Sequence, residues 1–298
     1  MDNTSVSITN FCLTTYLHKF VAHSILRSCK ELTMNKSSII LFLAISIALT
    51  SCSNKETASE VLQKTITSID NIESIYYKQD MARSNPRNIN DTIYRYREMY
   101  FKRLISDSIV GVKGHWYMYI NDKENIIYED IYDGNKLIRK NNRDSLARIY
   151  DLVKYPDFKK KHFWSHNTLY GMQYELKYMM NNSDSYLIAR LNDTIINSKD
   201  CYQILVTLEN KVTMPGFATK LENYDGIVSK TQYFIDKKTH YPIAIKGESY
   251  STDNPEQKAF LEQRYYDIKF NPTINENDEF NTSEESLKGF KITEKRPR

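Results

Sequence analysis

Apolar residues recur along this chain with two periods, and each change of period marks an element that the sequence predicts. Between residues 57 and 71 they fall at helical intervals, which predicts a helix that begins near Thr57 and ends near Asn71. Farther on, apolar and polar residues alternate, as in strands with one buried and one wet face. Strands are expected at 73–81, 92–104, 115–121, 125–132, 136–140, 185–191, 201–209, 228–235, 242–250 and 258–270.

The middle of the chain returns to a helical period. One helix is expected at 144–153, ended by Pro156, and a second from an N-cap at Asn167 to Met180. The second helix carries an aliphatic, methionine-rich face made of Leu169, Met172, Leu176 and Met179. Methionine adapts to varied apolar shapes, so this face is a candidate lid over a lipid-sized cavity. Ordinary packing of a helix on a sheet predicts the same pattern.

Two later segments are expected to lack regular structure. Residues 210–227 have the composition of a long connection, because they contain Met214-Pro215-Gly216 and Asp225-Gly226. Residues 281–298 form a polar, charged C-terminal tail that is expected to be loose. No internal repeat is found, so residues 57–280 are expected to form one domain.

An apolar run at 39–49 follows Lys36 and leads into Leu49-Thr50-Ser51-Cys52. Its 11 residues are too few to cross a bilayer, which takes about 20, but they suit a signal peptide. Residues 34–51 resemble the signal peptide and lipobox of bacterial lipoproteins. The resemblance implies that Cys52 is the lipid attachment site, carries acyl chains such as palmitate, and begins the mature protein. An uncleaved anchor with an incidental cysteine is the alternative.

The same resemblance orders the N-terminal part of the chain. Met34 is expected to be the true start, because an export signal belongs near the initiator, and residues 1–33 are then a doubtful extension. An unusually long basic region before the apolar run is the alternative. Residues 52–56 are expected to be a short tether between the lipid and the fold.

Composition and charge narrow the class of protein. The chain has 23 Tyr and only 8 Gly, a composition that favours strands and half-wet surfaces. Its formal net charge is +4, and no basic run is interleaved with aromatic residues. Nucleic acid is therefore not an expected partner.

The cysteines offer little redox chemistry. Two of the four, Cys12 and Cys29, lie in the doubtful extension, and Cys52 is assigned to the lipid. Only Cys201 remains, so neither an internal disulfide nor a C-x-x-C pair is expected in the body of the protein. Cys201 is expected to be buried and inert, with redox sensing as a minor alternative.

The histidines do not form a convincing catalytic or metal site. His162 and His166 are four residues apart, a spacing that can hold a metal on a helix, but no third ligand accompanies them. His115 and His240 stand alone on expected strands or turns. We therefore expect neither an enzyme nor a cofactor or metal site.

Three hairpin and strand-end segments resemble the LolA/LolB-like family of outer-membrane lipoprotein carriers and receptors. They are the turn at 132–136 (YDGNK), the hairpin at 233–243 (YFIDKKTHYPI) and the closing strand at 266–272 (YDIKFNP). The resemblance implies an α+β fold, a curved antiparallel β half-barrel covered by an N-terminal helix and mid-chain helices. The chain is also similar to the segment that precedes thioredoxin in some TlpA-type lipoproteins, without its C-x-x-C.

Two functions follow as hypotheses. The first is a non-enzymatic lipoprotein in the outer membrane, facing the periplasm, that binds a lipid, a lipoprotein acyl chain or another amphiphile. The second is an accessory or docking partner of a TlpA-like thiol–disulfide protein or another envelope-assembly protein. The cell surface is the alternative location.

Overall fold

The computed structural model describes residues 55–108, 110–120, 123–156, 159, 169–213 and 221–294. The helices and strands in these ranges belong to one compact unit, Glu56–Arg298, which contains its own hydrophobic core. This unit can therefore fold on its own. Cys52 and the predicted signal segment lie outside the described residues. Within those residues, no helix combines the length and the apolar character needed to cross a membrane.

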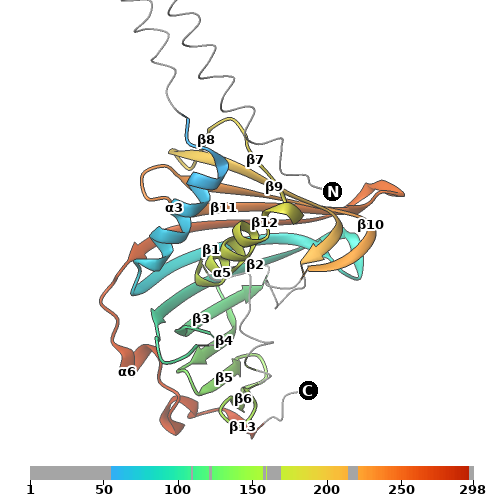
Figure 1. Cartoon of the computed structure of the whole chain (residues 1–298). Coiled ribbons are helices and arrows are strands. Elements are labelled where there is room, and N and C mark those ends of the chain that lie inside the picture. The colour runs from blue at the N-terminus through green and yellow to red at the C-terminus, as the bar shows by residue number, and fades with distance from the viewer. Residues whose placement is uncertain are drawn as a thin grey trace, which may run out of the picture. The chain divides into compact units, whose positions relative to one another are not determined.

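A single curved sheet of 13 strands forms the body of the unit (Figure 1). Its order is β13-β6-β5-β4-β3-β2-β1-β12-β11-β10-β9-β7, with β8 paired to β9 beside this path. Each described pairing is antiparallel except that of β13 with β6. The strands are β1 (Ser74–Asn85), β2 (Asn88–Arg103), β3 (Val112–Ile120), β4 (Ile126–Tyr132), β5 (Lys136–Asn141), β6 (Leu146–Asp151), β7 (Leu187–Arg190), β8 (Thr194–Ile196), β9 (Lys199–Thr213), β10 (Leu221–Asp236), β11 (Pro242–Ser251), β12 (Asn254–Phe270) and β13 (Lys291–Glu294).

Helix α3 (Ala58–Asp70) confirms the predicted N-terminal helix. Thr57 and Glu60 form a capping box, in which each side chain accepts a hydrogen bond from the other residue's backbone N–H. At the other end, the Arg103 guanidinium donates to the carbonyls of Ile69 (2.8 Å), in the last turn of the helix, and of Ile72 (3.0 Å), just beyond it. The buried face lies against the sheet through Val61, Leu62, Ile66 and Ile69.

Helix α5 (Leu169–Asn181) lies beside α3 on the same face of the sheet (Figure 1). Two buried side chains join the helices: Gln173 Nε2 donates to the Ile66 carbonyl at 3.1 Å, and the Tyr170 hydroxyl donates to that of Ile72 at 2.8 Å. These bonds satisfy polar groups that burial would otherwise leave unpaired. The predicted N-cap, Asn167, lies outside the described residues.

The predicted helix at 144–153 is wrong, because most of this segment is strand β6. Its residues pair with β5 on one side and with β13 on the other. Ala147 is fully buried, and Ile149 packs beside it against Ile131 and Ile138 of the sheet. A six-residue strand is too short for periodicity to distinguish from a helix, and its partner β13 is far away in the sequence.

The two segments expected to be irregular also contain strands. Residues 210–213 continue β9 and residues 221–227 begin β10, so the hairpin extends farther from the core than predicted. The tail is not loose over 281–294, because helix η2 (Glu284–Leu287) and β13 pack onto the sheet. Leu287 is buried there among apolar residues. The short helix α6 (Glu276–Glu279) precedes them.

The expected architecture holds at the coarse level. The structure is a large, open, antiparallel sheet with a few helices, and α3 and α5 cover one of its faces. Of the mid-chain helices expected, α5 is present and the one at 144–153 is replaced by β6. The covered face is concave, and we call it the concave face.

Candidate ligand-binding site on the concave face

A pocket of about 390 Å³ opens on the concave face beside the C-terminal half of α5. It is lined by alternate residues of four neighbouring strands, β9 to β12, and by α5. Directly opposite residues of antiparallel strands point to the same face, so the register collects these side chains in one place. On β10 to β12, for example, Thr231, Gly247 and Leu261 are cross-strand neighbours.

The pocket is apolar on its floor and walls. Met179 of α5, Val206 and Leu208 of β9, Ile245 of β11 and Leu261 of β12 supply this surface. Hydroxyl and amide groups come from Ser229, Thr231, Ser249 and Gln263. A volume of this size with few polar groups is typical of small-molecule sites, which span about 300–1,000 Å³.

Gly247 keeps the pocket open at its floor. An added Cβ there meets Leu261 Cβ at 3.7 Å, an ordinary van der Waals contact, so the backbone has room for a side chain. The missing side chain therefore creates space and does not serve a strained turn. A larger residue at this position is expected to fill the pocket without unfolding the strand.

A buried polar chain lies next to the pocket on β1, β2 and β12. Arg97 donates from Nη1 to Gln79 Oε1 at 3.1 Å, and the Tyr265 hydroxyl donates to Gln263 Oε1 at 3.0 Å. Burial lowers the pKa of Arg97 to about 10 and raises that of the Tyr265 hydroxyl above its usual value. The concave face is therefore not uniformly apolar.

Glu175 of α5 is the acidic residue of the pocket lining. The Tyr233 hydroxyl hydrogen-bonds to it, and the nearby carboxylate adds to the burial that raises the pKa of Tyr233 well above its usual value. The helix side of the pocket thus carries a carboxylate that is already bonded to the sheet.

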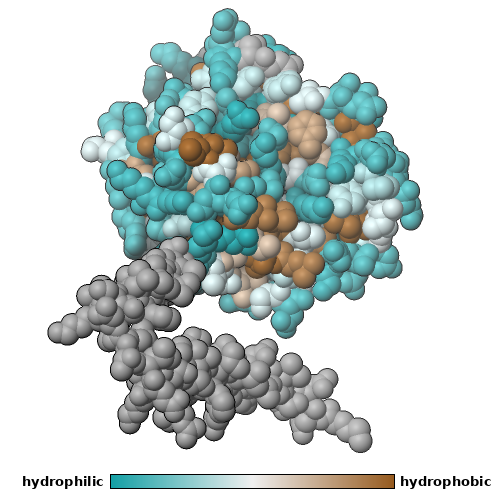
Figure 2. Space-filling view, turned by 90° about the horizontal axis from the view of Figure 1, so that it is seen from above, coloured by the Kyte–Doolittle hydropathy of each residue, from teal (hydrophilic) through white to brown (hydrophobic). Residues whose placement is uncertain are grey.

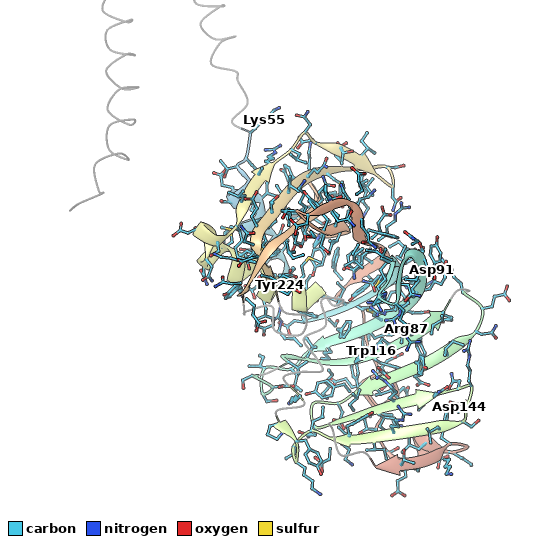
Figure 3. All side chains as sticks on the ribbon, turned by 90° about the vertical axis from the view of Figure 1, so that its right-hand side faces the viewer. Lys55, Arg87, Asp91, Trp116, Asp144 and Tyr224 are labelled. Carbon is cyan, nitrogen blue, oxygen red and sulfur yellow. The ribbon has the colours of Figure 1, made fainter. Side chains whose placement is uncertain are left out.

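A second hollow, of about 570 Å³, continues the pocket toward the rim of the sheet. The two share Ile227 and Ser249, and the outer hollow is also lined by the β1–β2 hairpin around Arg87. Figure 3 shows this hairpin from the rim, with Arg87 and Asp91 labelled on it and Tyr224 on β10. We call the two neighbouring hollows together the groove, and the outer hollow is the more open to solvent.

The predicted lid residues divide between the core and the pocket. Met172 and Leu176 are buried in the core between α5, α3 and the sheet. Met179 lines the pocket, while the side chain of Leu169 lies outside the described part of the chain. The sequence placed Val206 and Leu208 on one strand face but did not identify them, Gly247 or Leu261 as site residues. Only the long-range register joins these four positions.

The other candidate residues lie away from the groove. Cys201 is fully buried in a separate cluster with Phe234, Ile243 and Ala244, and burial raises the pKa of its thiol. His115 is buried on the opposite face, where it lies across from Ile131. The described residues contain no His, Cys, Asp and Glu group suited to a metal ion, and His162 and His166 lie outside them.

No family model matches this chain, and no curated protein does either. Among solved structures it is similar to lipoprotein LppX of Mycobacterium tuberculosis (8% identity, 73% of this chain and 97% of that one, TM-score 0.43). It is also similar to a domain described as an outer-membrane lipoprotein-sorting protein from Vibrio parahaemolyticus (10%, 77% and 97%, 0.32). A third is the MucA/MucB complex of Pseudomonas aeruginosa (7%, 79% and 63%, 0.40). At these identities and TM-scores, the similarities do not establish a function for this chain.

Proposed function

We propose that this protein is a non-enzymatic, lipid-anchored module that holds a lipid, a lipoprotein acyl chain or another amphiphile in its concave groove. The apolar pocket of about 390 Å³ beside Met179, Val206, Leu208 and Leu261 is the observation that carries the proposal. An acyl chain gains about 0.8 kcal/mol for each methylene that it buries against such walls. The outer hollow gives the chain a path to solvent.

The predicted lipid at Cys52 supplies the location. Two acyl chains on one cysteine meet the requirement for stable anchoring, which a single chain does not. The groove would then act at the envelope, on the periplasmic face of the outer membrane, with the cell surface as the alternative. Labelling with radioactive palmitate tests this directly. Cys52→Ser is expected to abolish the label and Cys201→Ser to keep it.

Ligand uptake tests the groove itself. The unit at 53–298 is to be purified without lipid and titrated with a fluorescent fatty acid, and native mass spectrometry records any lipid that co-purifies. Gly247→Leu places a side chain in the pocket and is expected to weaken uptake about tenfold, the cost of excluding about two methylenes. Lys246→Leu is the matched control, because Lys246 directly precedes Gly247 on the strand and its side chain is exposed.

Two results would contradict the proposal. One is saturable uptake that Gly247→Leu leaves unchanged, which would place the ligand elsewhere. The other is a protein that binds no lipid at all, which would favour the docking partner. Exposed apolar residues such as Leu187 of β7 and Ile195 of β8 favour that alternative. Figure 2 shows apolar side chains in several separate patches on the upper surface, without one continuous docking face.

A further inference from the structure

Two arginines project from the concave face next to the pocket, and we call them the arginine pair. Arg83 of β1 lies opposite Leu261, a pocket residue, and Arg95 of β2 lies opposite Met81, two residues along β1 from Arg83. Because directly opposite residues share a face, both guanidinium groups point to the side of the sheet that bears the pocket. They lie on β1, which is paired with β12, and on β2, the next strand of the sheet.

Both arginines have buried donors without partners. Within the described residues, Arg83 Nε and Arg95 Nε are buried and make no hydrogen bond. Burying a donor without an acceptor is unfavourable, and native proteins leave few such groups. Two such groups, on diagonal positions of neighbouring strands, form a pair of donors without an acceptor.

The charges lead to the same conclusion. Burial and the positive charge of Arg83 both lower the pKa of Arg95, so the arginine pair is held together against mutual repulsion. None of the ion pairs between described residues includes either arginine. Asp130, the carboxylate that acts on the neighbouring Arg97, is already bound by Arg139 Nε at 2.8 Å.

We propose that the arginine pair binds the anionic head of the amphiphile, a carboxylate or a phosphate, while the acyl chain occupies the pocket. The inference rests on the proposed function, because it assigns the head of the same ligand. Guanidinium groups bond such heads through paired N–H donors in a planar fork, and the charge strengthens each bond. Arg83 lies directly opposite Leu261 of the pocket, so the head would lie next to the end of the acyl chain.

Three ligands with the same chain separate head from tail. Dodecanol, dodecanoate and dodecyl phosphate are to compete with the neutral dye N-phenylnaphthylamine for the unit at 53–298. The unmodified protein is expected to bind both anions about tenfold more tightly than the alcohol, since a charged hydrogen bond contributes on this scale. The relative affinity of carboxylate and phosphate then indicates whether a fatty acid or a phospholipid is the natural source.

The double variant Arg83→Gln/Arg95→Gln is expected to bind the two anions no more tightly than it binds dodecanol. Arg264→Gln is the matched control, because Arg264 lies on β12 with its side chain 59% exposed and next to Glu262. Its neighbours Gln263 and Tyr265 face the concave side, so Arg264 faces the other. The control is expected to keep the full preference for anions.

A second variant guards against a double variant that fails to fold. Arg95→Lys keeps the charge but loses the fork, and it is expected to reduce the preference for anions by a few fold. Equal binding of the anions and the alcohol by the unmodified protein would overturn the head assignment and leave the proposed function standing. So would a preference that survives both variants. Binding of none of the three ligands would overturn both.

Discussion

The two halves of the sheet use the same concave face in opposite ways. Under α3 and α5, strands β1, β2 and β9 to β12 present a continuous apolar cluster that ends in the pocket. On β4 and β5 the same face holds ionic and polar pairs, such as Asp130 with Arg139 and the Tyr132 hydroxyl donating to Asp107. One half therefore leaves space and unpaired donors, while the other satisfies its buried polar groups. Open space together with unpaired donors identifies a binding surface better than apolar character alone.

The two halves also differ in which face of the sheet is covered. On β4 to β6 the convex face carries an apolar cluster beside the ion pair of Glu129 with Lys140, and the C-terminal segment covers this cluster: Leu287 lies against Ile131, Ile138 and Ala147. The C-terminal segment thus covers the convex face of this half, whereas helices α3 and α5 cover the concave face of the other half (Figure 1). The C-terminal segment therefore has a structural role, and it leaves the groove free for a ligand.

The largest predicted effect is on stability, and it concerns the half with β4 and β5, in which the buried polar groups are paired. Asp130 is 1% exposed and bonded to the Arg139 guanidinium. Asp130→Ala removes the carboxylate that accepts hydrogen bonds from Arg139 Nε and Nη2, which is expected to lower the free energy of unfolding by about 3–5 kcal/mol. Urea denaturation measures the loss.

The matched control replaces both partners. Asp130→Leu/Arg139→Met removes the charges together, and it is expected to be clearly more stable than Asp130→Ala, because no charge is left unpaired. Equal destabilisation of the two variants would mean that shape, and not charge pairing, holds this half together.

The second prediction concerns the helix-covered half. Leu176 is fully buried between α5 and the core, so Leu176→Ala is expected to lower the free energy of unfolding by about 3 kcal/mol. The same change is expected to weaken uptake of a fluorescent fatty acid, because α5 carries Met179 into the pocket. Tyr174→Ala, on the exposed side of the helix, is the control. Unchanged uptake in folded Leu176→Ala protein would separate the helix from the binding site.

Local chemistry made much of this architecture predictable. The Thr57 capping box and the Asp133-Gly134-Asn135 turn are both short-range: Asp133 Oδ1 accepts from the backbone N–H groups of Asn135 at 2.7 Å and Lys136 at 2.8 Å. The hairpins predicted at 132–136 and 233–243 are therefore present in the structure.

The misplaced elements depend on distant partners. Strand β6 pairs with β13, which lies 145 residues away where Lys291 meets Leu146. The pocket likewise depends on a register that places Gly247 beside Leu261 and Thr231. No window of the sequence contains these pairings, so the lid residues could be proposed and the pocket floor could not.

The smallest predicted effect concerns the ionic contact that begins the C-terminal cover. Glu276 of α6 accepts hydrogen bonds from Lys102 and from Lys113 (2.8 Å), and these bonds lower its pKa to about 2. A carboxylate with a lowered pKa stabilises the fold above its unfolded pKa of about 4.3, and the contribution disappears as pH falls toward 2. Because all three side chains are partly exposed, solvent screening limits it to about 0.5–1 kcal/mol.

Hydrogen exchange can measure this contribution in the C-terminal segment. The protection of amides at 276–294, relative to their intrinsic exchange rate at each pH, is expected to fall between pH 4.3 and 2 in the unmodified protein, and to fall less in Glu276→Gln, which lacks the titrating carboxylate. Glu285→Gln is the control, because Glu285 is 82% exposed and its oxygen lies 3.8 Å from Lys288 Nζ. An equal fall in protection in Glu276→Gln would assign the pH response to other carboxylates. The cover would then depend on Leu287 and the pairing of β13 with β6, and not on its ionic contact.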